Sequence, residues 1–580
     1  MQTELTFARD FALILSTAFL GGTIAKRFRL PLVVGYLFAG IFVGTFLTRF
    51  IPLSTTAQSI SEIGVALLLF TLGLELTLAK LKEFGEVIIL GSFIQIILTT
   101  LIGALLFPFL GLDFYSALFL GAVFSLSSTA VVVKTLSDSG ELETLHGEIS
   151  AGWLFMQDLY TLPLMIILPA VGIMLRIGQV GFEPILFLTR QIFLAFFSFF
   201  FVLFLGRKIV PFCMERIADL KSRELLLIAS VLFCLLFAFL FYVLGFSFAI
   251  GAFVAGILIS SSSARFGIFA EVRPLRDLFS CVFFVSLGFI LNPAFLFSYW
   301  QIILILVISV LTVKLLVSVV LVVLLGYHTK TAVLVGLSLI SVGEFAFILA
   351  VVGVSARLIS PDTYMIILWV TFLSLIISVP LMGSSHTLYY RFKKFVSTKS
   401  PWLARLISRL DKSPHPKLLS DSLKDHVVVL GFGRVGKYIC RALSFVEIPY
   451  VVVDYNHHIV KKLQNEGIQV IYGDPAEIDV LRFAQVAQAQ AVILAYADRH
   501  MQEVVITNTL SLNPKARLMC RVHFEEDQGR LKSLGVETIV QPEFEAAITL
   551  VEKLLRSFNV AEEEIEGKIK RLKIEHGSRG

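Results

Sequence analysis

Residues 150–176 read SAGWLFMQDLYTLPLMIILPAVGIMLR, and this stretch decides the class of fold. A helix of about 20 apolar residues crosses the ~30 Å hydrocarbon core of a bilayer, so the run predicts a membrane span. It nevertheless contains Asp158, ten residues after Glu148 and therefore about 15 Å along a helix that rises about 1.5 Å per residue. An ionised side chain at that depth costs at least ~2.5 kcal/mol, so Asp158 is a candidate functional residue.

The composition of the 580-residue chain is that of a membrane protein, because 57% of the residues are hydrophobic, 16% are charged and the mean hydropathy is +0.85. The charges are unevenly distributed. Residues 1–385 contain 21 Lys and Arg with 20 Asp and Glu, whereas the remaining 195 residues contain 28 and 23. The chain therefore joins a membrane part to a part in water. The net charge of +6 lies mainly in loops and a linker and gives no support to nucleic-acid binding.

Apolar runs between charged or Gly and Pro punctuation predict thirteen membrane helices. These runs lie near residues 11–25, 30–49, 60–76, 87–110, 115–137, 150–176, 190–212, 225–243, 246–261, 275–292, 297–326, 331–355 and 362–384. An odd number of spans places the two termini on opposite sides of the lipid bilayer. If the C-terminus is cytoplasmic, the inner loops collect fifteen Lys and Arg and the outer segments five. This asymmetry predicts an N-terminus outside and a cytoplasmic C-terminus.

Two further ionisable residues, Lys314 and Glu344, also lie inside apolar runs. Polar residues interrupt two of the runs at mid-depth, in FSLSSTA (124–130) and ISVGEFAF (340–347). Broken helices of this kind expose backbone carbonyls and helix ends to an ion site in secondary transporters, often in corresponding members of an inverted repeat. The first interruption makes Ser127, Ser128 and Thr129 candidate site residues. The alternative for the serines is ordinary helix packing with the hydroxyl bonded back to a carbonyl.

A single buried carboxylate suffices for coupled exchange. Asp158 can hold either a dehydrated monovalent cation or a proton, but not both, and this exclusion couples the two fluxes. If Lys314 lies near Asp158, it can pair with the empty carboxylate and be displaced by the cation. The alternatives for Lys314 are a static pairing with Glu344 or a snorkelling side chain. Glu344 itself either bonds to the backbone of the broken helix or touches an ion.

Six stretches of the membrane part resemble, in order, the signature sequences of monovalent cation:proton antiporters of the Kef-type potassium efflux branch. They are GVALLLFTLGLELTLAKLK (64–82), SLSSTAVVVKTLSDSGEL (125–142), HGEISAGWLFMQDLYTLPL (146–164), GAFVAGILISSS (251–262), FFVSLGFILNP (283–293) and VGEFAFILA (342–350). The resemblance implies a thirteen-helix homodimer with a scaffold domain and an ion-transport domain that contains two crossed broken helices.

The same resemblance implies that Asp158 is the ion-binding and proton-exchanging carboxylate. Related sodium/proton antiporters carry an acidic pair at this position, whereas potassium-type members carry Gln and Asp, as Gln157 and Asp158 do here. One residue departs from the pattern: many relatives have Gln three residues before the Glu of the second break, where this chain has Ser341. A small ancillary regulatory subunit is a further partner that this branch suggests.

The chain is expected to divide at residues 385, 425 and 545, giving a transmembrane domain (1–385), a basic linker (386–425), a nucleotide-binding domain (426–545) and a charged tail (546–580). The linker contains nine Lys and Arg against three acids. Its segment WLARLISRL predicts either a short amphipathic helix on the anionic inner leaflet or a solvated connection.

A dinucleotide-type fingerprint follows the linker in HVVVLGFGRVGKYICRAL (426–443). A β-branched run precedes glycines 431, 433 and 436, a helical segment follows, and the next strand YVVVD ends at Asp454. In a Rossmann-type α/β fold these glycines let phosphates approach the helix N-terminus, while the acid accepts ribose hydroxyls. Further strands are predicted at 469–474, 491–497 and 516–522. The candidate turn residues are Gly431, Gly433, Arg434, Val435 and Gly436.

Residues 426–545 resemble the TrkA-N or RCK domain that regulates potassium channels and transporters. The resemblance implies a regulatory adenine nucleotide, NAD(H), AMP or ATP, with Asp474 and Arg521 near the ligand. A membrane-bound dehydrogenase would need a second catalytic domain, and only about 35 residues follow the nucleotide-type domain, so no enzyme is expected. The remaining alternative is a Rossmann shell that binds nothing and dimerises.

These features predict potassium/proton exchange at the inner (cytoplasmic) membrane, gated by the nucleotide-binding domain. Sodium/proton exchange by the same fold is the first alternative. A ligand-gated potassium channel is the alternative from another class of transport protein. Such a channel would carry a selectivity-filter sequence such as TVGYG, which the sequence does not contain.

Overall fold

The computed structural model describes most of the chain. The described residues are 2–28, 30–46, 55–75, 85–142, 144–177, 204, 206–243, 248–355, 358–400, 402, 423–496, 499–522 and 525–578. The chain divides into two compact units. The first comprises Met1–Thr135, Ile149–Ser318 and Gly336–Gly383, and the second comprises Leu136–Glu148, Val319–Val335 and Ser384–Gly580.

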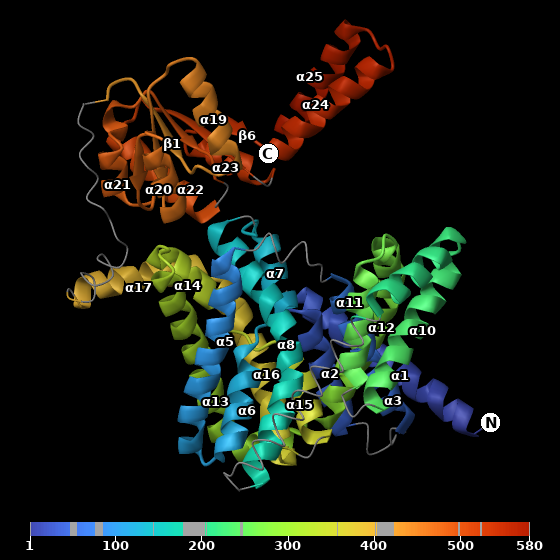
Figure 1. Ribbon diagram of the computed structural model, residues 1–580. Helices are drawn as coiled ribbons and strands as arrows, with labels where there is room; N and C mark the ends of the chain where they lie inside the picture. Colours follow the sequence, from blue (N-terminus) through green and yellow to red (C-terminus); the bar gives the residue numbers. More distant parts are fainter. Residues whose placement is uncertain are drawn as a thin grey trace. The chain divides into compact units, whose positions relative to one another are not determined.

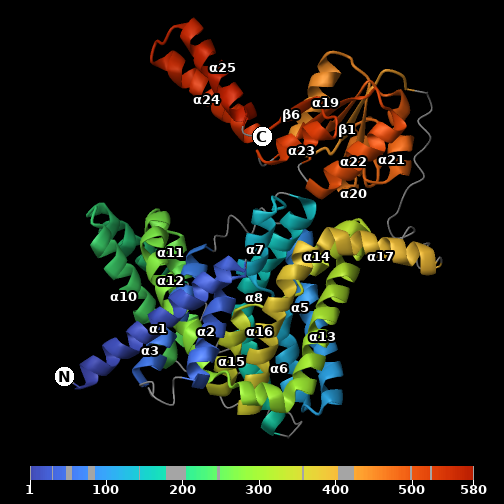
Figure 2. The ribbon, with the colours of Figure 1, turned by 180° about the vertical axis from the view of Figure 1, so that it is seen from behind.

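In the described residues of the apolar part, the regular secondary structure is helical. In chain order the helices are α1 (Gln2–Arg27), α2 (Leu32–Phe46), α3 (Thr55–Glu75), α5 (Glu86–Leu106), η1 (Phe107–Leu110), α6 (Phe114–Ser125), α7 (Thr129–Asp138), α8 (Leu145–Ile177), α10 (Arg223–Val243), α11 (Phe248–Ser260), α12 (Arg265–Ile290), α13 (Pro293–Leu324), α14 (Thr329–Ser338), α15 (Phe345–Ser355) and α16 (Pro361–Gly383). Within the first unit, α10, α11 and α12 lie at one side and α5, α6 and α13 at the other (Figures 1 and 2).

Membrane-crossing length is reached by five helices of the described part, or six if a bent pair counts as one span. The bent pair joins Leu145–Thr161 to Pro163–Pro169 at 44°, and Pro163 explains the bend because proline lacks the N–H of a helical hydrogen bond. Four shorter apolar helices accompany them. The multispanning character is thus confirmed, while the count of thirteen stays a prediction. Most of the predicted run 190–212 lies outside the described residues.

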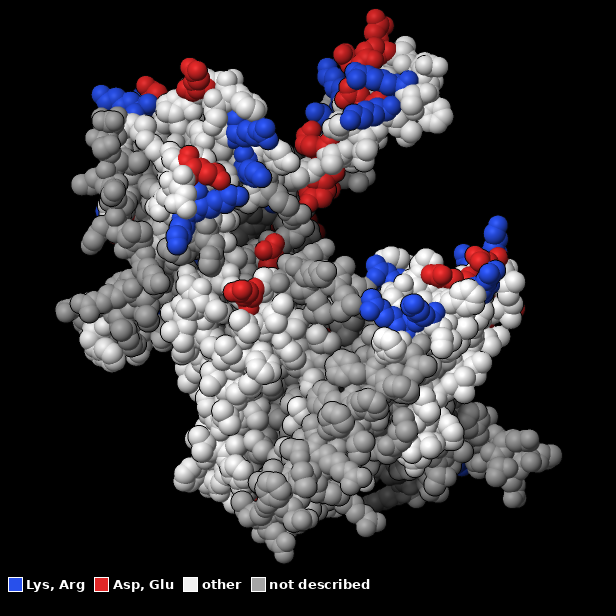
Figure 3. All heavy atoms as spheres, viewed as in Figure 1, with Lys and Arg blue, Asp and Glu red and all other residues white. Residues whose placement is uncertain are grey.

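Charged side chains of the helical part gather at one end of the helices on the face shown in Figure 3, while the described sides of the helices are uncharged. This distribution fits helices whose flanks face lipid and whose ends face water. Exposed apolar side chains on α10 illustrate the same point, for example Phe239, which is 62% exposed.

Two spans are interrupted where the sequence predicts broken helices. The first gap separates α6, which ends at Ser125, from α7, which begins at Thr129. The second gap separates α14 from α15. The two gaps touch, because the backbone N–H of Gly343 donates a hydrogen bond to the carbonyl oxygen of Leu126 at 3.0 Å. A Cβ on Gly343 would lie only 2.5 Å from the carbonyl oxygen of Ser127, so only glycine fits there.

Glycines also bring whole helices together in the first unit. A Cβ on Gly40 of α2 would lie 2.4 Å from a carbonyl oxygen of α12 and 2.9 Å from Gly288. A Cβ on Gly256 of α11 would lie 2.1 Å from the carbonyl oxygen of Phe70 in α3. These helices therefore pack backbone to backbone. Such contacts matter in lipid, where van der Waals packing rather than the hydrophobic effect holds helices together.

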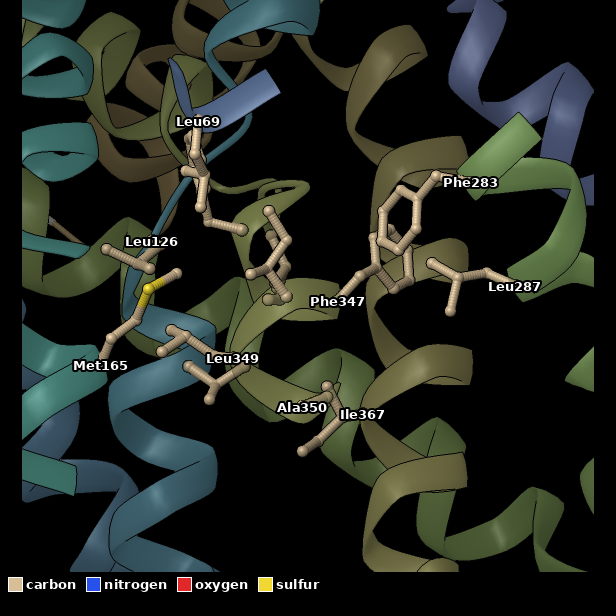
Figure 4. Close-up of a cluster of buried hydrophobic side chains, with 14 of the residues drawn as sticks. Leu69, Leu126, Met165, Phe283, Leu287, Phe347, Leu349, Ala350 and Ile367 are labelled. Atoms are coloured by element: carbon tan, nitrogen blue, oxygen red, sulfur yellow. The ribbon is translucent and has the colours of Figure 1, made fainter. Parts of the chain in front are cut away.

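Around the gaps the interior is apolar. Leu126 and Met165 lie together beside Leu349 of α15, and Phe347 points toward Phe283 of α12 (Figure 4). All five belong to one buried hydrophobic cluster. The polar atoms of the two gaps are thus enclosed by side chains that cannot hydrogen-bond, so they must find their partners among themselves.

The second unit contains the predicted Rossmann-type sheet. Its strands are β1 (Val427–Leu430), β2 (Tyr450–Asp454), β3 (Val470–Tyr472), β4 (Ala491–Leu494), β5 (Arg517–Arg521) and β6 (Thr538–Val540). All neighbouring pairs are parallel, in the order β3-β2-β1-β4-β5-β6. The first five strands were predicted from their β-branched runs, whereas β6 was not.

Alternate residues of β1, a central strand of the sheet, belong to two different hydrophobic cores. Val428 and Leu430 belong to the core that also contains residues of α21 (Ile478–Phe483), α22 (Arg499–Leu512) and α23 (Asp527–Ser533). Val427 and Val429 belong to the core that contains residues of α19 (Arg434–Phe445) and α20 (His457–Asn465). Helices therefore cover both faces of the sheet, as a doubly wound parallel fold requires.

Three more helices occupy the predicted linker and tail. They are α17 (Ser385–Lys399), α24 (Pro542–Ser557) and α25 (Glu562–Ser578). The predicted amphipathic segment WLARLISRL lies outside the described residues apart from Trp402. The tail boundary predicted at residue 545 falls within α24, and α24 contacts α25.

Candidate functional site

Asp158 lies at the first helix gap, on α8. The hydroxyl of Thr129 donates a hydrogen bond to Oδ2 of Asp158 at 2.9 Å, and Asp158 is only 5% exposed. Thr129 is the first residue of α7, so the carboxylate lies beside a helix N-terminus. The partial positive charge at that end favours an anionic group. The structure thus brings together two predicted site residues around one buried carboxylate.

Gln157 orients the backbone of the same gap. Its Oε1 accepts a hydrogen bond from the N–H of Ser127 at 2.8 Å, and its Nε2 donates to Oε1 of Gln95 at 2.8 Å. Gln95 in turn donates to the carbonyl oxygen of Ser125 at 3.3 Å. Sequence reasoning missed Gln95, although its signal was present: it is the one amide side chain in the apolar run 87–110. This amide chain is fully buried, so it fixes which way the amide of Gln157 faces.

The serines of the first gap bond to the second gap. Ser127 Oγ donates to the carbonyl oxygen of Leu339 at 2.8 Å, and Ser128 Oγ donates to Oε2 of Glu344 at 2.8 Å. The N–H of Ser128 also donates to Oγ of Ser341 at 3.4 Å. Ser341, the residue that departs from the family pattern, therefore contributes a hydroxyl to the crossing. These bonds join predicted residues that lie more than 200 positions apart in the sequence.

Lys314 reaches both gaps from α13. Its Nζ donates to the carbonyl oxygens of Leu126 at 2.8 Å and Ser341 at 2.7 Å, and the side chain is fully buried. A helix interruption leaves carbonyls without their helical N–H partners, and the Nζ donor of Lys314 supplies the missing hydrogen bonds. Among the described residues no carboxylate lies within ion-pair distance of Lys314, so neither pairing considered from the sequence is present in this structure.

The glycine turn of the second unit has the geometry that its spacing predicts. Gly431 has φ +93°, a backbone conformation that L side chains rarely adopt. A Cβ on Gly436 would lie 2.0 Å from the carbonyl oxygen of Gly431, which requires glycine at both positions. Gly433 caps α19, and a Cβ there would meet no atom within 4 Å. Val435 lies in the first turn of the helix, whereas the side chain of Arg434 is outside the described residues.

Asp454 is held by the backbone around that turn. Its Oδ2 accepts from the N–H of Phe432 at 2.8 Å and its Oδ1 from the N–H of Asn456 at 2.7 Å. Burial raises the pKa of Asp454 above its usual value, although these backbone hydrogen bonds oppose the rise. The predicted ribose acid thus also fixes the shape of the turn.

Asp474 and Arg521 lie at the ends of β3 and β5. Oδ1 of Asp474 accepts from the N–H of Ala476 at 3.0 Å, and its Oδ2 lies 3.3 Å from Nζ of Lys330. Burial, the largest single influence, would raise the pKa of Asp474, but the charge of Lys330, the hydrogen bond from Ala476 and the other contacts together outweigh burial and hold the pKa below its usual value. Arg521 accepts at its carbonyl oxygen from Gln502 at 2.6 Å. The pairing of Asp474 with Lys330 was not predicted, because a long-range ion pair leaves no local pattern in the sequence.

Comparisons with known proteins agree with both parts of the chain. The family model described as "Sodium/hydrogen exchanger, transmembrane" matches residues 14–383, and that of the TrkA-N domain matches residues 427–542. The chain is 29% identical over 544 residues to the Escherichia coli (strain K12) protein provisionally named cation/proton antiporter YbaL, covering 93% of this chain and 95% of that protein.

Two further comparisons extend this result. The chain is 34% identical over 387 residues to K(+) efflux antiporter 4 of Arabidopsis thaliana, which covers 66% of this chain and 64% of that protein. Its fold resembles that of the sodium proton antiporter MjNhaP1 from Methanocaldococcus jannaschii, with a TM-score of 0.50, 19% identity, and coverage of 71% of this chain and 99% of that chain. The buried carboxylate at two touching helix gaps and the family match over residues 14–383 lead to one conclusion: this chain belongs to the sodium/hydrogen exchanger family.

Proposed function

We propose that this protein exchanges potassium for protons across the cytoplasmic membrane and that an adenine nucleotide on its C-terminal domain regulates the exchange. The observation that carries the proposal is Asp158, one buried carboxylate bonded to Thr129 at the crossing of two broken helices. A cation and a proton compete for this group, so each leaves only when the other can replace it. Proton transfer to one side is thereby coupled to cation transfer to the other.

Oxygen atoms for a dehydrated cation are available around the carboxylate. Thr129 offers its hydroxyl, and the gaps contribute carbonyls of the kind that coordinate monovalent ions in transporters. We assign Asp158 the ion-binding role and Gln157 a positioning role, because the amide of Gln157 is committed to Ser127 and Gln95. Ser127, Ser128 and Glu344 hold the crossing together, and Lys314 donates hydrogen bonds to two of its carbonyl oxygens.

Potassium is proposed as the cation rather than sodium. Support comes from the Gln157–Asp158 pair, which resembles the potassium-type pattern, and from relatives that are named K(+) efflux antiporters. The finer architecture belongs to the same proposal. It comprises thirteen spans with inverted repeats, a homodimer that uses the scaffold helices, an outer N-terminus and a cytoplasmic C-terminus.

Ion selectivity tests the transport proposal directly. In proteoliposomes with an imposed proton gradient, we expect potassium to drive proton flux more strongly than sodium, with rubidium close to potassium. The measurement is the quench of an internal pH dye as each cation is titrated. Faster flux with sodium would favour sodium/proton exchange. Flux that follows membrane voltage alone and ignores the proton gradient would favour a channel and contradict exchange.

Nucleotide regulation is supported by the contacts of Asp474. This predicted ligand-binding acid is paired with Lys330 of α14, the same helix that ends at Ser338 before the second gap. A nucleotide that bonds to Asp474 would compete with Lys330 for the carboxylate. The ligand then binds the paired and unpaired arrangements with different affinities, which is the condition for it to shift transport.

The Gly433→Asp variant tests the nucleotide turn. Aspartate is a good N-cap and nothing crowds a side chain at this position, so the fold should persist. Its charge would nevertheless lie where the nucleotide phosphates approach the start of α19. We expect the affinity for AMP, ATP or NAD(H), measured by calorimetry, to fall about tenfold or more, equivalent to about 1.4 kcal/mol.

Gly433→Asn is the matched control, because it has nearly the same size and capping ability without the charge. It should retain most of the affinity, and both variants should melt near the wild-type temperature. Wild-type protein that binds none of these nucleotides would reduce the domain to a dimerisation scaffold. Equal binding by the Asp and Asn variants would place the phosphates elsewhere.

A further inference from the structure

Three side chains that have no role in the ion site or the nucleotide turn meet within the second unit. Glu141 precedes α8, His146 lies in the first turn of α8, and His386 lies in the first turn of α17. Oε2 of Glu141 is 3.0 Å from Nε2 of His146, and its Oε1 is 3.3 Å from Nε2 of His386. All three ligand-type atoms lie within 4.8 Å of one another. The two imidazole side chains are only 4% and 6% exposed.

The hydrogen bonds around Thr144 favour one tautomer of His146. Thr144 donates its single hydroxyl hydrogen to the carbonyl oxygen of Glu141 at 2.6 Å and accepts from the N–H of Gly147 at 3.2 Å. Nδ1 of His146 lies 2.9 Å from the same hydroxyl oxygen, and we assign it as the donor while the hydroxyl hydrogen stays bonded to the carbonyl oxygen of Glu141. In the neutral ring, Nε2 then presents a lone pair to the Glu141 carboxylate.

A lone pair and a carboxylate oxygen repel each other at 3.0 Å unless a cation lies between them. Protonation of the ring would supply one such cation. Protonation of His146 alone would leave His386 unchanged, although His386 faces the other oxygen of the same carboxylate. Two protonated rings would then share one negative charge in a buried site, with their ring centres 5.9 Å apart. One divalent metal ion would satisfy all three groups together.

The donor set and its spacing match a zinc-type ion. Two imidazole nitrogens and one carboxylate are a common ligand set for Zn²⁺, with the fourth tetrahedral position left to water. Bond lengths of about 2.0–2.1 Å place the ligand atoms of a tetrahedral site about 3.3 Å apart. The distances from the two histidine nitrogens to the two oxygens of the Glu141 carboxylate, 3.0 and 3.3 Å, are close to that edge, and all three ligand atoms lie within 4.8 Å of one another. The bond from Nδ1 of His146 to Thr144 is the kind of outer contact that orients a metal-binding histidine.

We propose that Glu141, His146 and His386 form a binding site for a divalent zinc-type metal ion. The ion would join the start of α17 to the segment that leads into α8. Since α17 opens the linker and α8 carries Asp158, occupancy would fix the connection between the linker and the helix that bears the ion-site carboxylate. This site is separate from the proposed transport site, and it can be tested without any transport measurement.

Metal binding to the purified full-length protein tests the proposal. After removal of metals with a chelator, Zn²⁺ is titrated against a competing indicator dye, and Co²⁺ is added separately to read its coordination from visible absorption. We expect one Zn²⁺ per chain and a Co²⁺ spectrum typical of tetrahedral nitrogen and oxygen ligands. We also expect Zn²⁺ to raise the melting temperature, since a ligand that binds only the folded state stabilises it.

Variants separate this site from adventitious binding. Glu141→Gln, His146→Ala and His386→Ala should each weaken Zn²⁺ binding at least about tenfold and abolish the zinc-dependent rise in melting temperature. Glu148→Gln, an exposed acid at the start of the same helix, should change neither. Each variant is compared with itself with and without metal, so a loss of stability cannot imitate the result. Zinc affinity equal in wild type and the three variants, or no zinc-dependent stabilisation of wild type, would overturn the proposal in favour of a protonated histidine pair.

Discussion

Asp158→Asn should reduce cation-coupled proton flux to the level of protein-free liposomes. Asparagine keeps the size of the side chain and an oxygen that accepts the hydrogen bond from Thr129, so the crossing should stay intact. It removes the charge that attracts the cation and the group that exchanges the proton. Without a titrating group the two fluxes have no common site at which to compete. Flux is measured by pH-dye quench in proteoliposomes, and folding by size-exclusion elution.

The control for this experiment is Asp113→Asn. Asp113 caps α6 by accepting from the N–H of Ser116 at 3.0 Å, and asparagine caps helices equally well. This variant loses a carboxylate of the same unit without touching the ion site, and it should transport like wild type. Coupled exchange retained by Asp158→Asn would remove Asp158 from the mechanism.

Gly343→Ala should cause the largest loss among single-methyl additions near the site. The added Cβ would lie 2.5 Å from the carbonyl oxygen and 2.8 Å from the carbonyl carbon of Ser127, and backbone cannot move aside as a flexible side chain can. The two gaps would have to separate, which would break the hydrogen bond from Gly343 to Leu126. We expect about 1–3 kcal/mol of destabilisation, the usual range for overpacking, together with loss of transport.

Thermal melting in detergent and proteoliposome flux are the two measurements. Gly383→Ala is the matched control, because a Cβ there meets no atom within 4 Å and alanine favours the end of α16. It should melt at or above the wild-type temperature and transport normally. If Gly343→Ala melts and transports like wild type, the close crossing of the gaps is not needed for function.

Local patterns explain why much of the fold could be predicted. The spans follow from apolar length, and Asp158 is evident because one acid in such a run is costly. The glycine turn follows from spacing, since Gly431 adopts a positive φ and Gly436 leaves no room for a Cβ. Each of these signals lies within a few turns or strands of sequence.

Partners from distant segments could not be predicted. The sequence suggested that Lys314 pairs with a carboxylate, since opposite charges attract most strongly in a medium of low dielectric constant. In the structure Lys314 instead bonds to two carbonyls, which became available only because two helices break at the same depth. Gln95 and His386 likewise gain their importance from residues 62 and 245 positions away, namely Gln157 and Glu141. Local sequence patterns do not indicate contacts between residues so far apart in the chain.

The backbone contacts of Gly40 and Gly256 have a mechanical consequence. Where carbonyls lie against glycines, sliding by even one residue rise of about 1.5 Å would drive an oxygen into a side chain, so α2 with α12 and α3 with α11 are stiff pairs. The contact between α12 and α15 differs, because it includes the rings of Phe284 and Phe347, with centroids 6.2 Å apart, in place of glycine against backbone. Any rocking that opens Asp158 first to one side of the bilayer and then to the other should therefore move each of these glycine-packed pairs as one body.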